Sequence, residues 1–200
     1  GHTPLPDDLL HMRDLVPEDE YRYQTIYAKN EGAVVAPTAG FHFSREVIKK
    51  MEIKGIDTCF ITLHSGLGNF RAIEVEDLTK HKMDSEQMII NEDNARMINN
   101  AKAAGRKVCT VGTSSMKAVE TAAIIDNRVK VFNGWTNKFI FPPYEFAISD
   151  AMITNFHPPL SSMLMQVAAF GGYELIMNAY KYAIEKKYKF FTYGDAMLII

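Results

Sequence analysis

The sequence is poor in cysteine and has no long apolar run. Its two cysteines, Cys59 and Cys109, stand alone in strand-like stretches, with no second thiol or histidine at metal-ligand spacing. This pattern excludes a disulfide framework and a zinc–thiolate site, and it predicts a protein of the reducing cytoplasm. No apolar stretch approaches the roughly 20 residues that cross a bilayer. The opening residues also lack the basic and apolar regions of a signal peptide, so we expect no membrane association.

Several nucleotide and hydrolase motifs are missing as well. There is no GxxxxGK[ST] loop, which argues against a nucleoside triphosphatase, and no GxSxG elbow, which argues against an α/β hydrolase. The stretch SGLGNF, residues 65–70, has only two of the three glycines of a dinucleotide fingerprint. No Asp or Glu accompanies the histidines at ligand spacing, so we predict that no metal ion is bound.

What is present is the composition of a globular domain. The 200 residues are 47% hydrophobic and 23% charged, and the net charge is −2. Residues 1–17 hold three of the eight prolines and show no clear period, so we expect an N-terminal linker there. Residues 18–200 are long enough to bury a core and are expected to form a single α/β domain.

One basic segment stands out against this weak net charge. Residues 180–191 alternate lysines with aromatic residues. Such a run can bind phosphates and stack on bases, or it can be an ordinary helix whose lysines are solvated. Lys186, Lys187 and Lys189 are therefore candidate contacts for a nucleic-acid backbone, with the solvated helix face as the alternative.

Strand-like and helix-like segments alternate along the chain. Polar capping residues before apolar periods predict helices, and clusters of β-branched and aromatic residues predict strands. The expected helices span residues 17–29, 44–55, 91–105 and 160–187 (broken at Gly171–Gly172), the expected strands span 32–37, 56–64, 85–91, 150–157 and 194–200, a strand, turn and helix share 106–123, and a hairpin or edge strands lie within 129–146. This order predicts an α/β fold with a mainly parallel or mixed sheet and helices on both faces, a Rossmann-like three-layer arrangement.

Four of the expected strands end in loops of similar chemistry. The stretch APTAGFHF, residues 36–43, reads either as a turn around Pro37 and Gly40 or as a ligand loop that presents Thr38 and His42. Ligands bind beyond the carboxyl ends of parallel strands, so recurrence of such loops favours a ligand site. The other three loops carry His64, Gly66 and Gly68; Thr113 and Ser114; and Asn155 and His157.

These loops predict a polar pocket with titratable groups. His42, His64 and His157 are candidate general acids or bases. Thr113 and Ser114 begin a helix, where they either hold an anionic group of a ligand or simply cap the helix. We expect the pocket to take a polar organic substrate.

Seven ordered segments of the chain resemble one enzyme family. They are GHTPLP, YQTIYA, APTAGFHF, TLHSGLGNFR, VGTSSMKAVE, TNFHPPLSS and KFFTYGDAMLI, and they span essentially all 200 residues. In this order they are similar to the S-adenosylmethionine:tRNA ribosyltransferase-isomerases, the QueA family. The resemblance implies an enzyme of queuosine biosynthesis that moves the ribosyl moiety of S-adenosylmethionine onto 7-aminomethyl-7-deazaguanine in tRNA. The products would be epoxyqueuosine-tRNA, adenine and methionine.

The resemblance also implies partners and site residues. S-adenosylmethionine would be a co-substrate, with no resident cofactor, and the tRNA would be the second substrate of a protein expected to be monomeric. Because a sulfonium acidifies the adjacent ribose carbon, one of the three histidines would remove that proton, and another group would protonate the departing adenine. The motif positions that would bind substrate are Pro37, Thr38, Gly40, Gly66, Gly68, Phe70, Glu86, Gly112, Thr113, Ser114, Thr154, Asn155, Phe156, Tyr193 and Asp195.

The chain departs from the family pattern in places. Asp84 replaces a histidine of the family's MHSE, Lys117 an arginine, Pro158 an apolar residue and Ser162 a threonine. Family members are also longer, with a β-barrel inserted in the α/β domain, and we expect that barrel and the opening strands to be absent here. The alternatives are a diverged, non-catalytic module that binds S-adenosylmethionine or tRNA, and a hydrolase whose three histidines share a metal ion.

Overall fold

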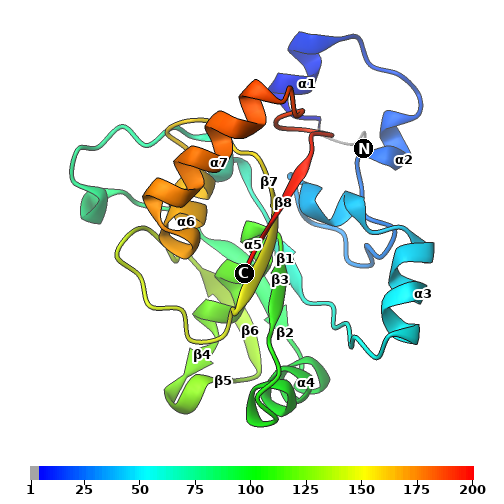
Figure 1. Cartoon of the computed structure of the whole chain (residues 1–200), viewed down its shortest axis with the longest axis vertical. Coiled ribbons are helices and arrows are strands. Elements are labelled where there is room, and N and C mark those ends of the chain that lie inside the picture. The colour runs from blue at the N-terminus through cyan, green and yellow to red at the C-terminus, as the bar shows by residue number, and fades with distance from the viewer. Residues whose placement is uncertain (1–4) are drawn as a thin grey trace.

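The computed structural model of the chain describes residues 5–200, except for the side chains of Asp7, Asp8, Met12 and Phe70. Short helices and strands alternate along these residues (Figure 1). The helices are α1 (Asp7–Met12), α2 (Asp19–Arg22), α3 (Arg45–Ile53), α4 (Glu92–Ala103), α5 (Thr113–Thr121), α6 (Ser162–Gly171) and α7 (Tyr173–Glu185), with 3₁₀ turns η1 (Thr38–His42), η2 (Leu67–Phe70), η3 (Leu78–Lys80) and η4 (Ile125–Asn127). The strands are β1 (Thr62–His64), β2 (Glu86–Ile90), β3 (Cys109–Val111), β4 (Ala123–Ile124), β5 (Arg128–Val129), β6 (Phe132–Thr136), β7 (Ala151–Asn155) and β8 (Ala196–Ile199).

The strands form three small sheets. In the first, β2 lies between β1 and β6, and both pairings are antiparallel. In the second, β7 lies between its parallel neighbour β3 and its antiparallel neighbour β8, while β4 and β5 form a separate antiparallel pair. The predicted α/β class is confirmed. The expected single, mainly parallel sheet is not formed: among the described strands only β3 and β7 run parallel, and the strands are divided among three sheets instead of forming a three-layer arrangement.

The parallel pair sets the position of the site. Val111 of β3 is in register with Ile153 of β7, and the Gly112 N–H donates to the Ile153 carbonyl at 2.8 Å. Both strands therefore end at the same edge of the sheet, because parallel strands run in the same direction. Residues 112–114 and 154–157 follow at that edge.

The predicted helix boundaries are confirmed where a side chain caps the helix. Ser44, Asn91 and Ser161 each accept a hydrogen bond from the backbone N–H three residues later, at 2.9–3.2 Å. Such a bond satisfies one of the donors left free in the first turn. The predicted break at Gly171–Gly172 is also present, and Gly172 has a φ of 82° between α6 and α7.

Of two predicted strands, one is not formed and the other is shortened. Residues 32–37 pair with no described strand. The N–H groups of Val34 and Val35 both donate to the Ser65 carbonyl, at 2.8 and 3.3 Å. These two donors therefore share one carbonyl oxygen and do not form the hydrogen-bond ladder of a β-sheet. Of the strand expected over residues 56–64, only β1 joins a sheet.

The helix predicted over residues 17–29 ends after α2. Tyr23 is only 2% exposed, and its ring contacts those of Phe41 and Tyr193 edge-on, with centroids 5.6 and 6.3 Å apart. Burying an aromatic side chain contributes about 1.5–3 kcal/mol, whereas helix propensity contributes under ~1 kcal/mol per residue. Tertiary burial therefore outweighs the local preference here.

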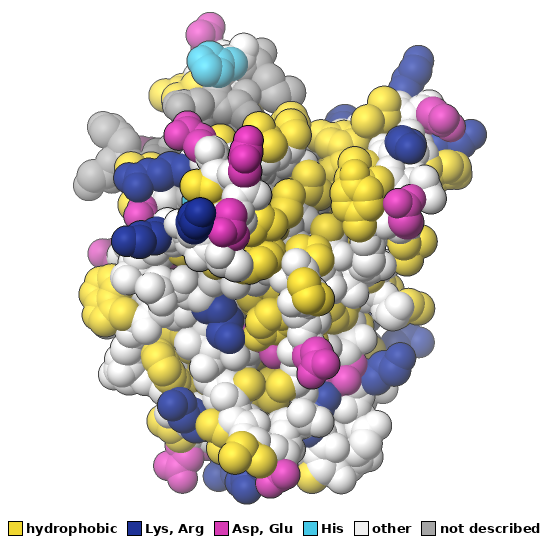
Figure 2. All heavy atoms as spheres, turned by 90° about the vertical axis from the view of Figure 1, so that its left-hand side faces the viewer, with side chains coloured by type: hydrophobic (Ala, Val, Ile, Leu, Met, Phe, Trp, Pro, Cys, Tyr) yellow, Lys and Arg dark blue, Asp and Glu magenta, His cyan; other side chains and the backbone are white. Residues whose placement is uncertain are grey.

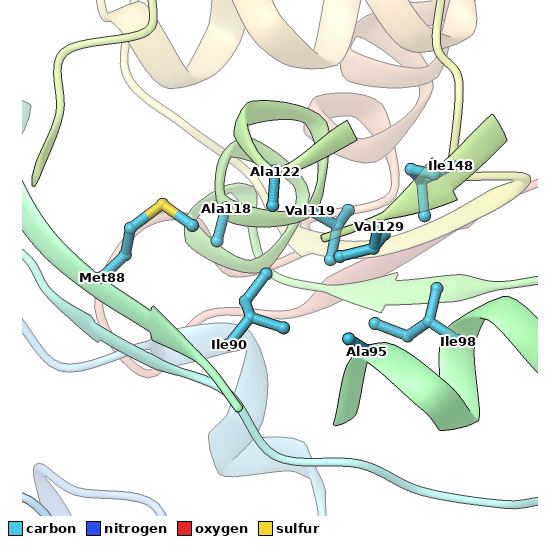
Figure 3. Close-up of a cluster of buried hydrophobic side chains, with 9 residues drawn as sticks. All are labelled: Met88, Ile90, Ala95, Ile98, Ala118, Val119, Ala122, Val129 and Ile148. Atoms are coloured by element: carbon cyan, nitrogen blue, oxygen red, sulfur yellow. The ribbon is translucent and has the colours of Figure 1, made fainter. Parts of the chain in front are cut away.

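Helix α5 is packed between two hydrophobic clusters. On one side Ala118 and Val119 meet Met88 and Ile90 of β2, with side chains of α4 beside them (Figure 3). On the other side Met116 joins a cluster built from β7, α6 and α7. Because both sides are buried, α5 is fixed in place, and its first turn is held at the edge of β3.

The surface carries charges of both signs. On the face shown in Figure 2, Lys and Arg side chains lie among Asp and Glu, with hydrophobic side chains between them. No helix within residues 5–200 combines the length and the apolar character that crossing a membrane requires.

Glu120 of α5 holds the segment that leads into β7. The residue is 3% exposed. Its Oε1 accepts hydrogen bonds from the N–H groups of Ile148 and Ser149, at 3.0 and 2.9 Å, and its Oε2 accepts one from Ala147 at 3.0 Å. Hydrogen bonds to an ionised acceptor are about twice as strong as neutral ones. The entrance to β7 is therefore anchored on α5.

Replacing Glu120 tests this anchor. Glu120→Gln keeps the size of the side chain but turns one acceptor oxygen into an NH₂ group that faces a backbone N–H. Because a buried donor then lacks an acceptor, we expect the free energy of unfolding to fall by about 1–3 kcal/mol. The matched control, Glu145→Gln at an exposed position nearby, should change it by less than about 0.5 kcal/mol. Urea denaturation measures both, and equal losses would contradict the anchor.

Candidate functional site

Two neighbouring cavities lie at the edge where the chain leaves β3 and β7. The larger has a volume of about 570 Å³ and the smaller about 400 Å³. Thr38 and Asn155 line both cavities. We therefore describe them as the large lobe and the small lobe of one candidate site.

The large lobe is built mainly from the predicted strand-end loops. Its predicted residues are Pro37, Thr38, Gly112, Thr113, Ser114, Thr154, Asn155, Phe156 and His157. Tyr23, Val35 and Met163 add apolar wall, and Ser65 contributes from the loop after β1. The structure thus brings all four predicted loops to a single cavity, the fourth through Ser65, Leu67, Asn69 and Arg71 and not through its predicted residues His64, Gly66 and Gly68.

The small lobe is more polar and more cationic. It is lined by Arg13, Asp19, Arg22, Thr38, Phe41, His42, Asn155, Lys189, Tyr193 and Gly194. Of these, Thr38, His42, Asn155, Lys189 and Tyr193 were predicted as site residues. The predicted site is therefore spread over two adjoining spaces.

The segment 36–43 reaches both lobes but folds as the 3₁₀ turn η1. Gly40 is buried, and a Cβ there would lie 2.2 Å from the Tyr27 hydroxyl and 2.6 Å from Thr25 Cγ2. Only glycine fits that space, so Gly40 serves packing. Of the predicted site residues in this segment, Pro37, Thr38 and His42 line the lobes.

Asn155 determines which nitrogen of His42 carries the hydrogen. Its Nδ2 faces the carbonyl oxygens of Phe191 and Gly194, at 3.4 and 3.3 Å. An NH₂ group donates to both, so the Asn155 Oδ1, which lies 3.2 Å from His42 Nε2, is the acceptor of that contact. The hydrogen of the neutral His42 ring is therefore on Nε2. Nδ1 keeps a lone pair that can accept a proton.

His157 is held as a neutral group in the large lobe. It is 8% exposed, and burial lowers its pKa to about 4. Its Nε2 lies 2.7 Å from Thr154 Oγ1, and its backbone N–H donates to the Tyr180 hydroxyl at 2.8 Å. Burial in turn raises the pKa of Tyr180 to about 12. At neutral pH His157 can form hydrogen bonds, but it carries no extra proton to give to a substrate.

Glu86, predicted to bind substrate, is engaged by the protein itself. It is buried, its Oε2 accepts a hydrogen bond from Lys117 Nζ, and its Oε1 accepts from the Gly66 N–H and from Asn69 Nδ2, at 3.1 and 2.6 Å. Lys117 is buried as well, so the two charges form an internal ion pair. Asn69 lines the large lobe. Glu86 and Gly66 therefore shape the lobe through Asn69 without lining it.

Two further predicted residues, His64 and Gly68, line neither lobe. The His64 ring lies against Gly32, where a Cβ would be 2.8 Å from His64 Nδ1, while the next side chain, Ser65, faces the large lobe. Gly68 leaves room for Asp84, since a Cβ would lie 2.6 Å from Asp84 Oδ2. The side chain of Phe70 is outside the described residues.

Only some of the predicted site residues near the C-terminus line a lobe. Tyr193 lines the small lobe, but Asp195 accepts a hydrogen bond from the Lys189 backbone N–H at 2.7 Å and stabilises the turn. Lys189 lines the small lobe, whereas Lys186 Nζ lies 5.6 Å from the centre of the Tyr182 ring. Lys187 lies just beyond the end of α7 with a φ of 61° and lines neither lobe.

Sequence reasoning missed Arg13, Asp19 and Arg22. Arg13 donates through both terminal nitrogens to the Asp19 carboxylate, at 2.6 and 2.8 Å, and this contact lowers the pKa of Asp19 to about 2. The Tyr193 hydroxyl lies 3.4 Å from the same carboxylate. In the sequence these charges belong to an ordinary charged stretch. No local pattern signals that Asp19 is buried.

Metal binding has no support in the described part of the chain. No three described His, Cys, Asp or Glu side chains gather as metal ligands do. The three histidines that would share a metal ion in the hydrolase alternative are not brought together, because His64 lies outside both lobes.

The low pKa of His157 predicts how stability depends on pH. The unfolded chain takes up a proton near pH 6.5, whereas the folded ring stays neutral to about pH 4. The contribution of His157 to the free energy of unfolding is therefore fully present above about pH 6.5. It decreases as the pH falls from about 6.5 to about 4. The loss approaches about 1.4 kcal/mol per pH unit and totals about 3 kcal/mol.

His157→Gln cannot take up this proton. The free energy of unfolding of the variant, measured by urea denaturation from pH 8 to pH 4, should fall less steeply below pH 6.5 than that of the unaltered protein. Above pH 7 the difference between the two proteins should be constant, which separates the titration from any loss of packing. Parallel curves over the whole range would contradict the buried neutral state.

Comparisons with known proteins identify relatives of the chain. The family described as "Queuosine biosynthesis protein" matches residues 1–199. The S-adenosylmethionine:tRNA ribosyltransferase-isomerases of Phocaeicola vulgatus and Parabacteroides distasonis are 61% and 62% identical to the chain over all 200 residues. The chain spans only 56% and 57% of the length of these relatives.

A solved structure is similar as well. The crystal structure of S-adenosylmethionine tRNA ribosyltransferase from Thermotoga maritima aligns with a TM-score of 0.66 at 34% sequence identity. The alignment covers 82% of this chain and 51% of that chain. From the family match along nearly its whole length, together with these relatives, the chain belongs to the S-adenosylmethionine:tRNA ribosyltransferase-isomerase family of queuosine biosynthesis proteins.

Proposed function

We propose that this chain acts as a tRNA-modifying transferase-isomerase. It would move the ribosyl moiety of S-adenosylmethionine onto 7-aminomethyl-7-deazaguanine in tRNA, giving epoxyqueuosine-tRNA, adenine and methionine. The observation that carries the proposal is the convergence of the predicted loops on the large lobe, with His42 lining the adjoining small lobe. The large lobe has a volume of about 570 Å³, which lies within the roughly 300–1,000 Å³ of small-molecule sites.

S-adenosylmethionine would occupy the large lobe. The lobe combines apolar wall from Tyr23 and Val35 with polar groups of Thr113 and Ser114. These two residues begin α5, where free backbone N–H groups and the helix dipole favour a negative group such as the methionine carboxylate. Gly112, with a φ of 89°, allows the chain to turn into the helix there.

His42 would be the general base. The sulfonium of S-adenosylmethionine acidifies the adjacent ribose carbon, and the lone pair of His42 Nδ1 can take the proton that is lost. The resulting imidazolium keeps its hydrogen bond from Nε2 to Asn155 Oδ1, which stabilises the positive charge. The same imidazolium then holds a proton for the departing adenine.

His157 would have a different part. With its pKa lowered to about 4, it is suited to hydrogen bonding and orientation through Thr154, and not to donating a proton at neutral pH. The remaining predicted residues of the two lobes would contact substrate directly. Glu86, Gly66, Gly68 and Asp195 would act by holding loops in place. A cytoplasmic location and a monomeric state stay predictions from the sequence.

His42→Gln tests the proposed base. The amide can replace the donor to Asn155 but cannot accept the proton, so kcat for adenine release should fall about 10²–10⁴-fold. The dissociation constant of S-adenosylmethionine, measured by calorimetry, should be little changed. Adenine release is followed with labelled S-adenosylmethionine and tRNA that carries the deazaguanine.

The matched control is His11→Gln, an exposed histidine in α1 that lines neither lobe. It should leave adenine release unchanged. Full activity in His42→Gln would exclude His42 as the base. An unaltered protein that binds S-adenosylmethionine or tRNA but releases no adenine would instead identify a non-catalytic binding module.

A further inference from the structure

The small lobe is lined by two cations, Arg22 and Lys189, that pair with no carboxylate among the described side chains. Both oxygens of Asp19 are taken by Arg13, at 2.6 and 2.8 Å, so these two charges cancel. Arg22 and Lys189 line the same space, and within the described residues neither forms an ion pair. An excess of positive charge therefore faces a cavity of about 400 Å³.

The backbone that carries one of these cations is held in a fixed position. The Lys189 N–H donates to Asp195 Oδ2 at 2.7 Å, and the Asp195 N–H donates to the Lys189 carbonyl at 2.8 Å. This pair of bonds closes the turn between α7 and β8. The Lys189 side chain thus begins from a defined point beside the small lobe.

Two neutral side chains, Tyr193 and His42, complete the wall. The Tyr193 hydroxyl lies within 3.4 Å of Asp19, and the His42 ring is oriented by Asn155. The chain as a whole is weakly acidic, with a net charge of −2, and the face in Figure 2 mixes both signs. The cationic character of the small lobe is therefore local, as expected for a site that recognises an anion.

We propose that the small lobe binds a phosphate group of a nucleic-acid backbone, with Arg22 and Lys189 as its ligands. A phosphodiester keeps its negative charge at all physiological pH values, and the planar guanidinium of arginine matches the phosphate oxygens. This inference rests on the proposed function. It places the backbone of the tRNA beside the large lobe. The phosphate contact would then position the deazaguanine without discriminating between tRNA sequences.

The test is a comparison of two double variants of the whole protein. Arg22→Gln/Lys189→Gln removes the two cations of the small lobe. Lys186→Gln/Lys187→Gln removes the same charge from the same region, at positions that line neither lobe. Affinity for fluorescein-labelled tRNA is measured by anisotropy across a salt series, and affinity for S-adenosylmethionine by calorimetry.

Each phosphate contact releases counterions, so losing two should reduce the slope of log K against log[salt] by about 1.4–1.8. We expect this change in Arg22→Gln/Lys189→Gln, with S-adenosylmethionine binding and melting temperature unchanged. The control pair should keep the original slope. An equal change in both pairs, or in neither, would overturn the phosphate site.

Two other results have separate meanings. Loss of S-adenosylmethionine binding with an unchanged salt slope would assign the cations to the carboxylate of that substrate and overturn the inference alone. Absence of any tRNA binding by the unaltered protein would overturn the proposed function together with it.

Discussion

The buried ion pair between Glu86 and Lys117 is the interaction on which the arrangement of the site depends. Glu86 belongs to β2 in one sheet, and Lys117 to α5, which follows β3 of another. The same carboxylate holds Gly66 and Asn69. Removing one partner of such a pair leaves an uncompensated buried charge and costs about 3–5 kcal/mol. One residue thus fixes the loop after β1 and the first turns of α5 around the large lobe.

The strand ends that line the large lobe could be predicted from sequence because their signals are local. Apolar runs followed by Gly112 and Thr113, or by Asn155 and His157, mark where a chain leaves a sheet, and parallel pairing brings them together. The position of His64 could not be predicted in this way. Side chains alternate along a strand, so a difference of one residue decides whether His64 or Ser65 faces the lobe.

The small lobe was hidden from sequence analysis for another reason. Arg13 lies in a stretch assigned to a linker, and Arg22 in a helix that ends early because Tyr23 is buried. Asp19 reads as a solvated helix-start acid until Arg13 and Tyr193 are seen beside it. Contacts between residues 13 and 193 depend on tertiary packing. No period, cap or motif within either segment carries that information.

Asn155 connects the two lobes through its hydrogen bonds. Its amide is held by the carbonyls of Phe191, which lines the large lobe, and Gly194, which lines the small lobe, and it orients His42. A ligand that displaces either carbonyl changes the amide that both lobes share. Such a ligand in one lobe would alter the affinity of the other lobe for its own ligand, and linkage would make the effect mutual and equal in size.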